Sequence, residues 1–185
     1  ATTHKPQVVI DAMNEFWSKG NANVHRGIHT LSQRATQSFD AVRQKVQRFI
    51  HAPDEREVIF VRGCTEGINL VAHSWGLDNL QPGDEIALSA MEHHSNIVPW
   101  QLIAEQTGAK VRVLPMNDAA ELDLDAAKDV INERTKLVGL VHLSNALGTI
   151  NPAKEIVALA KSVGARVLID GAQATLHLPI NVQEL

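Results

Sequence analysis

Residues 137–170 read LVGLVHLSNALGTINPAKEIVALAKSVGARVLID, and this stretch decides the fold. It opens with an apolar run rich in Leu and Val at 137–143 and closes with a second apolar run at 166–170. Between the two runs, the apolar residues of 156–160 recur at helical spacing, and Pro152 suits a helix start because it has no amide hydrogen to satisfy. The stretch therefore predicts a strand, a helix and a second strand parallel to the first.

The same alternation extends toward the N-terminus as far as residue 58. Short runs rich in Val, Ile and Leu occur at 58–61 (VIFV), 86–89 (IALS) and 111–114 (VRVL), with helical patterns between them. Such runs are typical of strands that are buried on both faces of a parallel sheet. We therefore predict an α/β fold for residues 58–185, with a mostly parallel sheet between helices.

The first 57 residues have a different pattern. Residues 6–21 and 31–52 are expected to form two helices, joined by a loop rich in Gly, Asn and His. The expected organisation is a helical lead-in at 1–57 followed by the α/β domain at 58–185.

The composition is that of a folded protein and disfavours several function classes. Of the 185 residues, 44% are hydrophobic and 21% are charged, which is ordinary for a globular domain. The formal net charge of −4 disfavours a general nucleic-acid-binding role. No apolar run approaches the roughly 20 residues of a membrane-spanning helix. Cys64 is the single cysteine, so no disulfide forms within the chain and a reducing compartment, the cytoplasm, is expected.

Polar clusters follow the predicted strands, at the end of a parallel sheet where ligands bind. Because the carboxyl ends of parallel strands meet at one edge, we expect hydroxyl, imidazole, amide and carboxylate groups to gather there. The clusters are GCTEG at 63–67, AMEHH at 90–94, SNALG at 144–148 and DGAQ at 170–173.

The first cluster opens a helix and leaves two interpretations of Thr65 open. The free amide groups of a helix start, with a Thr hydroxyl among them, form a phosphate site. Alternatively, Thr65 is only the N-cap of that helix, with Glu66 in its first turn. Cys64 is a candidate nucleophile because a helix dipole can activate a thiol, but a small residue beside a phosphate is the role that we favour.

Two later clusters carry the other candidate groups. Asp170 ends a strand, where a carboxylate could hold a metal, a ribose hydroxyl or a protonated ring nitrogen, or could simply cap a helix. Gln173 lies close enough in sequence to reach the same ligand. His93 and His94 are adjacent, and neighbouring side chains diverge, so we expect no metal site and instead expect one ring to stack on a planar ligand.

Four segments follow the order and spacing of one known family: RGCTEGIN at 62–69, MEHHSNIVPW at 91–100, HLSNALGT at 142–149 and VLIDGAQA at 167–174. They closely resemble the class V aminotransferase family, and within it the group II cysteine desulfurases of the SufS type. The segment RGIHTLS and the opening ATTHKP also match. MEHHSNIVPW together with DGAQ is the specific part of the resemblance.

The resemblance implies a pyridoxal 5′-phosphate enzyme of fold type I, with this chain as a fragment of the large domain. Thr65 would bind the cofactor phosphate beside Cys64, which stands where the family usually has a second Thr. His93 would stack on the pyridine ring. Residues 1–57 would be the helical lead-in and substrate-side loop, and residues 58–185 the N-terminal part of the large cofactor-binding domain.

Four further residues receive roles from the resemblance. Asp170 would pair with the ring nitrogen, and Gln173 would hydrogen-bond the phenolic oxygen of the cofactor. Asn145 would lie near that oxygen and near the substrate carboxylate, and His25 would line the substrate side. The physical chemistry agrees, because an aspartate keeps the ring nitrogen protonated and the protonated ring accepts electrons from the substrate.

The implied reaction removes sulfur from L-cysteine to give L-alanine and an enzyme persulfide for iron–sulfur cluster assembly. The family's cofactor-linking lysine and catalytic cysteine are expected beyond Leu185, so we expect no catalytic residue in this chain and no activity from it alone. The expected partners are a sulfur-acceptor protein and a second copy in a homodimer, with no nucleic acid and no membrane. The alternatives are selenocysteine lyase activity on L-selenocysteine, another class V activity, or a non-catalytic module of the same fold.

Overall fold

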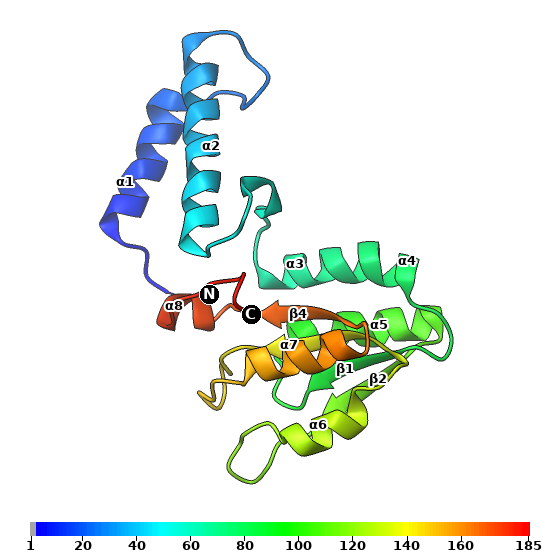
Figure 1. Cartoon of the computed structure of the whole chain (residues 1–185). Helices are drawn as coiled ribbons and strands as arrows, with labels where there is room; N and C mark the ends of the chain where they lie inside the picture. The colour runs from blue at the N-terminus through cyan, green and yellow to red at the C-terminus, as the bar shows by residue number, and fades with distance from the viewer. Residues whose placement is uncertain (1–2) are drawn as a thin grey trace. The chain divides into compact units, whose positions relative to one another are not determined.

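A computed structural model describes residues 3–185 and divides them between two compact units. The first unit extends to Val58 and the second spans Ile59–Leu185 (Figure 1). The first two residues of the ATTHKP match lie outside the described residues. No helix within 3–185 is both long enough and apolar enough to cross a membrane.

Two helices form most of the first unit, as the sequence predicts. Its elements are α1 (Gln7–Glu15), a π-helical turn η1 (Phe16–Gly20), α2 (Thr30–Phe49) and a 3-10 turn η2 (Glu55–Glu57). His29 caps α2, because its Nδ1 accepts a hydrogen bond from the amide of Ser32 at 3.3 Å. The side chain of Ser32 donates in turn to the carbonyl of Asn23, which ties the loop between the helices to the start of α2.

One sheet of four parallel strands forms the centre of the second unit. Its strands are β1 (Glu85–Ser89), β2 (Lys110–Leu114), β3 (Thr135–Val141) and β4 (Arg166–Asp170). They lie in the order β2-β1-β3-β4, which confirms the predicted α/β class with a mostly parallel sheet. The chain winds outward from β1 to β2 and then outward from β3 to β4, so its direction reverses between β1 and β3. Ligands bind at such a reversal in open parallel sheets.

Helices cover both faces of this sheet (Figure 1). The helices α3 (Cys64–Val71) and α5 (Val98–Thr107) pack on one face, and α6 (Leu124–Val130) and α7 (Ala153–Ser162) pack on the other. Gly108 ends α5 in a left-handed conformation with φ of 77°, which suits a glycine C-cap. The remaining short elements of this unit are η3 (Ala72–Gly76), α4 (Leu77–Asn79), η4 (His94–Asn96) and α8 (Ala174–His177).

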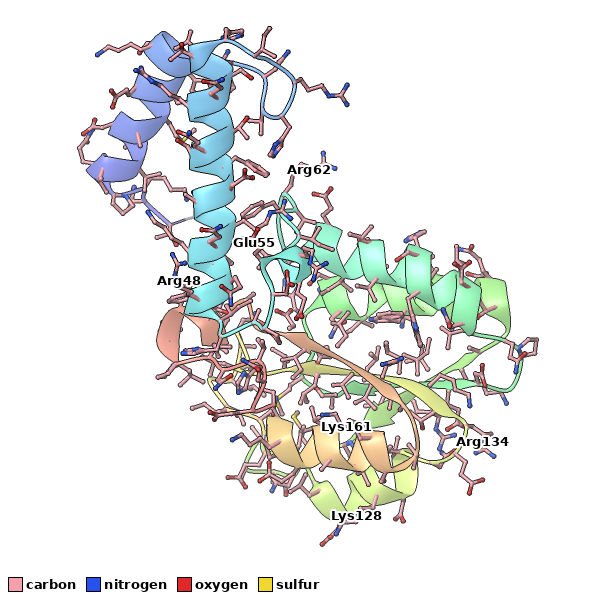
Figure 2. The ribbon with its side chains drawn as sticks, turned by 45° about the horizontal axis from the view of Figure 1, so that its top comes forward. Arg48, Glu55, Arg62, Lys128, Arg134 and Lys161 are labelled. Carbon is pink, nitrogen blue, oxygen red and sulfur yellow. The ribbon has the colours of Figure 1, made fainter. Side chains whose placement is uncertain are left out.

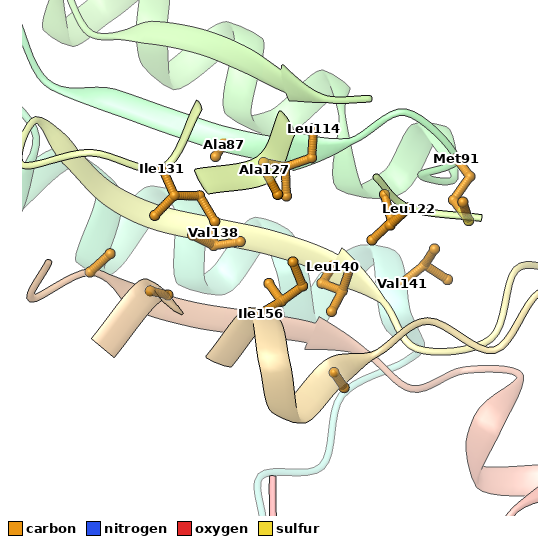
Figure 3. Packing of buried hydrophobic residues seen from close by; sticks show 13 residues of the cluster. Ala87, Met91, Leu114, Leu122, Ala127, Ile131, Val138, Leu140, Val141 and Ile156 are labelled. Atoms are coloured by element: carbon orange, nitrogen blue, oxygen red, sulfur yellow. The ribbon is translucent and has the colours of Figure 1, made fainter. Parts of the chain in front are cut away.

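Two clusters of buried apolar side chains hold these layers together. On one face Val138, Leu140 and Ile156 are fully buried, and Figure 3 shows them where α7 meets β3. On the other face Ile86 and Trp100 are fully buried where α5 meets β1. Each such side chain contributes about 1.5–3 kcal/mol of hydrophobic stabilisation, so the sheet is fixed from both sides.

The predicted strand at 58–61 is wrong. Val58 is buried, but Ile59 is 67% exposed, and within the described residues the segment forms no part of the sheet. A run of Val, Ile and Phe has the composition of a buried strand, but a strand also needs a neighbour to complete its ladder of hydrogen bonds. The composition of a run shows that it is prone to form a strand, but it does not show whether a neighbouring strand is there to pair with it.

The predicted strand at 137–143 ends early, because the last residue of β3 is Val141. Asn151 replaces a neighbouring strand there: its Nδ2 donates to the carbonyl of Val141 at 2.7 Å, and its amide donates to the carbonyl of His142 at 2.9 Å. Leu143 forms an isolated bridge with Ile150 instead. The edge strands β2 and β4 are also partly exposed, whereas burial on both faces was predicted.

Glu85 ties the loop before β3 to the start of β1. Its buried carboxylate accepts hydrogen bonds from Nδ2 of Asn132 at 2.9 Å and from Nε of Arg134 at 3.1 Å. Burial alone would raise the pKa of Glu85, but the hydrogen bonds from Asn132 and Arg134 and the charge of Arg134 outweigh it and lower the pKa. The ionised carboxylate is therefore the form that the folded state stabilises.

Replacing Arg134 by alanine is expected to lower the free energy of unfolding at neutral pH by about 1–2 kcal/mol, because a buried carboxylate loses a donor. Glu85 contributes this stability above the ordinary pKa of a glutamate and loses it as the pH falls through its lowered folded pKa. Urea unfolding of R134A and of the unaltered chain should therefore converge once the pH is low enough to protonate Glu85 in the folded state. Lys128→Ala is the control, since Lys128 projects from α6 into solvent (Figure 2) and its pair with Asp125 is exposed. Equal losses for both variants at neutral pH would contradict the assignment.

Candidate active site

The carboxylate of Asp170 is fixed at the carboxyl end of β4. Asp170 is 5% exposed, and its Oδ1 accepts hydrogen bonds from the amide of Ala172 at 2.9 Å and from the thiol of Cys64 at 3.3 Å. Its carbonyl accepts from the amide of His142, which follows β3, at 3.0 Å. A buried carboxylate is thus held at the rim of the sheet and joined directly to the first residue of α3.

The start of α3 has no side-chain cap from its N-cap residue, because that residue is Gly63. Glu66, in the first turn, binds Arg62 instead, and its Oε2 accepts from the amide and Nε of Arg62 at 2.7 and 2.9 Å. Thr65 lies inside the first turn, so the interpretation of Thr65 as the N-cap is wrong. The amides of a first turn have no partner within the helix, and such amides are suited to binding an anion.

Cys64 is a hydrogen-bond donor in this structure. Although the residue is exposed, partial burial of its sulfur, followed by the charge of Asp170 and their hydrogen bond, raises the pKa of the Cys64 thiol to about 12. The negative charge of Glu92 acts in the same direction. A thiol with this pKa stays protonated at neutral pH, which argues against Cys64 as a nucleophile.

His93 lies on the turn between β1 and η4, with its ring exposed to solvent. Its Nδ1 accepts a hydrogen bond from the amide of Ser95 at 3.1 Å and lies 2.8 Å from the Ser95 hydroxyl. The ring of His94 lies 6.2 Å away in a T-shaped arrangement, at an interplanar angle of 65°. Because η4 packs against α3, the fixed ring of His93 belongs to the same end of the sheet as Cys64.

Asn145 and Gln173 occupy loops that leave the sheet at the same end. Asn145 is exposed on the loop after β3, where the hydroxyl of Ser144 accepts from nearby amides, and Gln173 is half-buried just before α8. His25 belongs to the first unit. Its Nε2 lies 3.3 Å from Asp40, and its backbone adopts a left-handed conformation with φ of 58°.

A family model described as Aminotransferase class-V matches residues 1–185. The chain belongs to the class V aminotransferase family. A relative named probable cysteine desulfurase, from Mycolicibacterium paratuberculosis, is 54% identical over all of this chain and 27% of its own length.

Solved structures agree with this assignment. The apo structure of a cysteine desulfurase from Thermococcus onnurineus NA1 superposes with a TM-score of 0.93 at 40% identity, over 100% of this chain and 45% of that one. A mutant of C-DES with glycine covalently linked to its PLP cofactor superposes with a TM-score of 0.84 at 27% identity, over 97% of this chain and 47% of that one. The class V chain therefore spans less than half the length of these proteins.

Sequence reasoning missed Glu92, which this class V chain carries inside MEHHSNIVPW. Glu92 is 9% exposed, and its carboxylate accepts from Ser89, from Asn96 Nδ2 at 2.8 Å and from the amide of Val141 at 2.6 Å. Glu92, Asn96 and Trp100 are spaced by four residues, so the spacing could have placed the three on one stripe. The contact with Val141 spans 49 residues and has no local signal.

Proposed function

We propose that this protein is a pyridoxal 5′-phosphate (PLP) dependent cysteine desulfurase. Residues 58–185 form the N-terminal part of its large cofactor-binding domain, and residues 1–57 form the helical lead-in with the substrate-side loop. The observation that carries the proposal is the buried carboxylate of Asp170 joined to the start of α3, which has no side-chain cap. The 54% identity to a relative named probable cysteine desulfurase supports it.

The residues present fit PLP at both of its charged ends. Its phosphate suits the start of α3, where amides carry partial positive charge and Thr65 adds a hydroxyl beside Cys64. Its protonated ring nitrogen suits Asp170, because a buried carboxylate is stabilised by a cationic partner. His93 is then available to stack on the ring.

When bound, PLP supplies an electron sink for negative charge that develops on the substrate. Asp170 holds a proton on the ring nitrogen, because its negative charge favours the cationic form. The thiol of Cys64 stays protonated at neutral pH and donates a hydrogen bond to Oδ1 of Asp170, which fixes the carboxylate. The amide of Ser95 donates a hydrogen bond to Nδ1 of His93, which fixes the orientation of the imidazole ring that would stack on PLP.

The remaining contacts concern the phenolic oxygen, the substrate and the partners. Gln173 and Asn145 bind the phenolic oxygen, and Asn145 and His25 contact the substrate, L-cysteine. The products are L-alanine and an enzyme persulfide, which passes sulfur to an acceptor protein for iron–sulfur cluster assembly. A homodimer and a cytoplasmic location are part of the same proposal.

Two measurements test the proposal. Equilibrium dialysis of the full chain against pyridoxine 5′-phosphate, which has no aldehyde to react with surface lysines, should show one saturable site. A protein that contains this chain together with a cofactor-linking lysine and a loop cysteine should release alanine from L-cysteine when PLP is supplied. Absence of saturable binding, or of alanine release, would refute the proposal.

Gly63→Asp is expected to weaken pyridoxine 5′-phosphate binding by about tenfold, since a carboxylate at the N-cap competes for the amides that the phosphate needs. The backbone of Gly63 is extended and a Cβ there meets nothing within 4 Å, so the change fits without strain. Urea unfolding should show no loss of stability, because aspartate is a good N-cap. Gly63→Asn is the neutral control and should bind more tightly than G63D. Unchanged binding by G63D would place the phosphate elsewhere.

A further inference from the structure

We infer that Glu92 is a positioning residue that fixes the turn carrying His93 to the end of β3, an inference that rests on the proposed function. Its carboxylate lies at the reversal between β1 and β3, where an open parallel sheet binds ligands. It holds His93 in place through hydrogen bonds on both sides of the turn.

Glu92 completes the sheet where β1 stops. β1 and β3 pair up to Leu88 and Gly139, and after Ser89 the chain turns away from β3. The amide of Val141 faces this gap, and Oε1 of Glu92 accepts its hydrogen bond at 2.6 Å. The hydroxyl of Ser89 donates to the same oxygen. The side chain of Glu92 thereby acts as the missing acceptor of β1 and avoids an unpaired buried amide.

The other oxygen of Glu92 begins a chain of buried hydrogen bonds with a fixed direction. Nε1 of Trp100 donates to Oδ1 of Asn96 at 2.9 Å, and Nδ2 of Asn96 donates to Oε2 of Glu92 at 2.8 Å. An indole can only donate, so Trp100 decides which way the Asn96 amide points. Asn96 must then present its amino group to Glu92, and the residue at 92 has to accept on both oxygens.

Gly139 in β3 leaves room for Asn96, which belongs to this chain of hydrogen bonds. A Cβ on Gly139 would lie 3.2 Å from Nδ2 of Asn96 and 2.6 Å from Cδ2 of Leu88, so only glycine leaves the space that Asn96 occupies. Glu92 and Asn96 are both buried and bracket residues 93–95, whereas His93 itself is exposed. Burial raises the pKa of Glu92, opposed by its three hydrogen bonds and reinforced by the charge of Asp170. The buried residues Glu92 and Asn96 therefore hold both ends of the turn in place, while the ring of His93 between them stays exposed.

Glu92→Gln is the decisive variant, because an amide has the shape of the carboxylate but only one accepting end. If its oxygen faces Val141, its amino group meets the amino group of Asn96; if it is turned round, it meets the amide of Val141. Asn96→Asp, added to E92Q, reverses the mismatch, because an aspartate accepts both from Trp100 and from the new amide. The pair of substitutions therefore forms a double-mutant cycle with a built-in rescue.

We expect E92Q to weaken pyridoxine 5′-phosphate binding to the full chain by about tenfold and to speed hydrogen exchange at the amide of Val141. The E92Q/N96D double variant should return both to within about threefold of the unaltered chain, while N96D alone, with two facing carboxylates, should bind worst. Ile103→Val is the control for general loosening, since it thins the same core without touching the hydrogen bonds and should leave binding unchanged.

Binding by E92Q at the unaltered level, or a double variant that stays weak, would overturn the inference while the proposed function stands. If the unaltered chain shows no saturable binding, the proposed function fails and the inference fails with it. If E92Q does not fold, the double variant decides alone: a folded, binding double variant supports the assignment, and an unfolded or non-binding one overturns it.

Discussion

Asp170→Asn should weaken the binding of pyridoxine 5′-phosphate by about 100-fold, the largest effect on binding that we expect from a single residue. Asparagine keeps the shape of the side chain and an oxygen to accept from Ala172 and Cys64, but it removes the charge that pairs with a protonated ring nitrogen. Breaking a buried charge pair from one side costs about 3–5 kcal/mol, and 1.4 kcal/mol corresponds to about tenfold in affinity, so about 100-fold is the lower end of the expected loss. Equilibrium dialysis measures the change directly.

The rate of alkylation of Cys64 is a second measurement, and it separates loss of charge from loss of structure in D170N. The negative charge of Asp170 is one cause of the raised pKa of Cys64, so its removal should lower that pKa and speed alkylation of the thiol by iodoacetamide. Asp118→Asn, on an exposed turn, is the control and should change neither binding nor alkylation. Tight binding by D170N, with the thiol more reactive, would show that the ring nitrogen does not pair with Asp170.

Trp100→Ala should lower the free energy of unfolding by about 3–5 kcal/mol, the largest effect on stability that we expect. Trp100 is fully buried among Ile86, Ile103 and neighbouring side chains, so alanine leaves a cavity. It also leaves Oδ1 of Asn96 without its donor, which adds the cost of an unsatisfied buried acceptor. Urea unfolding followed by circular dichroism gives the value without relying on the fluorescence that the substitution removes.

Two other substitutions serve as comparisons for the loss of stability in W100A. Trp100→Phe keeps a six-membered aromatic ring but loses the Nε1 donor and the second ring of the indole, so its loss should still be smaller than that of W100A. Trp17→Ala, at a residue that is 64% exposed, should be nearly neutral. A loss for W100A no larger than that for W17A would contradict the role of Trp100 in the core.

The strands that composition predicted well are those that pair with another strand among residues 3–185. The run 166–170 became β4 without a change of bounds, and 86–89 and 111–114 each gained one residue. The run 58–61 has an equally β-prone composition but forms no strand, because pairing depends on partners that a local run does not encode. Local pattern therefore predicted the fold class but also predicted one strand, at 58–61, that does not form.

The candidate site shows the same division between local and distant information. Asp170 could be singled out because a carboxylate at a strand end is a local signal, and the structure joins it to Cys64. Whether Thr65 was an N-cap could not be decided from sequence, since helix bounds shift by a residue or two, and Gly63 takes that place. Glu92 escaped notice because its role depends on Val141, far along the chain.

The raised pKa of Cys64 has a practical consequence for spectroscopy. A single cysteine usually has to be replaced before a fluorophore or spin label is attached elsewhere, but this thiol is held protonated by its surroundings. A second cysteine placed at an exposed position such as Ser162, at the end of α7, keeps an ordinary thiol and is the faster to react with a maleimide. The chain can therefore carry a reporter group with its own cysteine still in place beside Asp170.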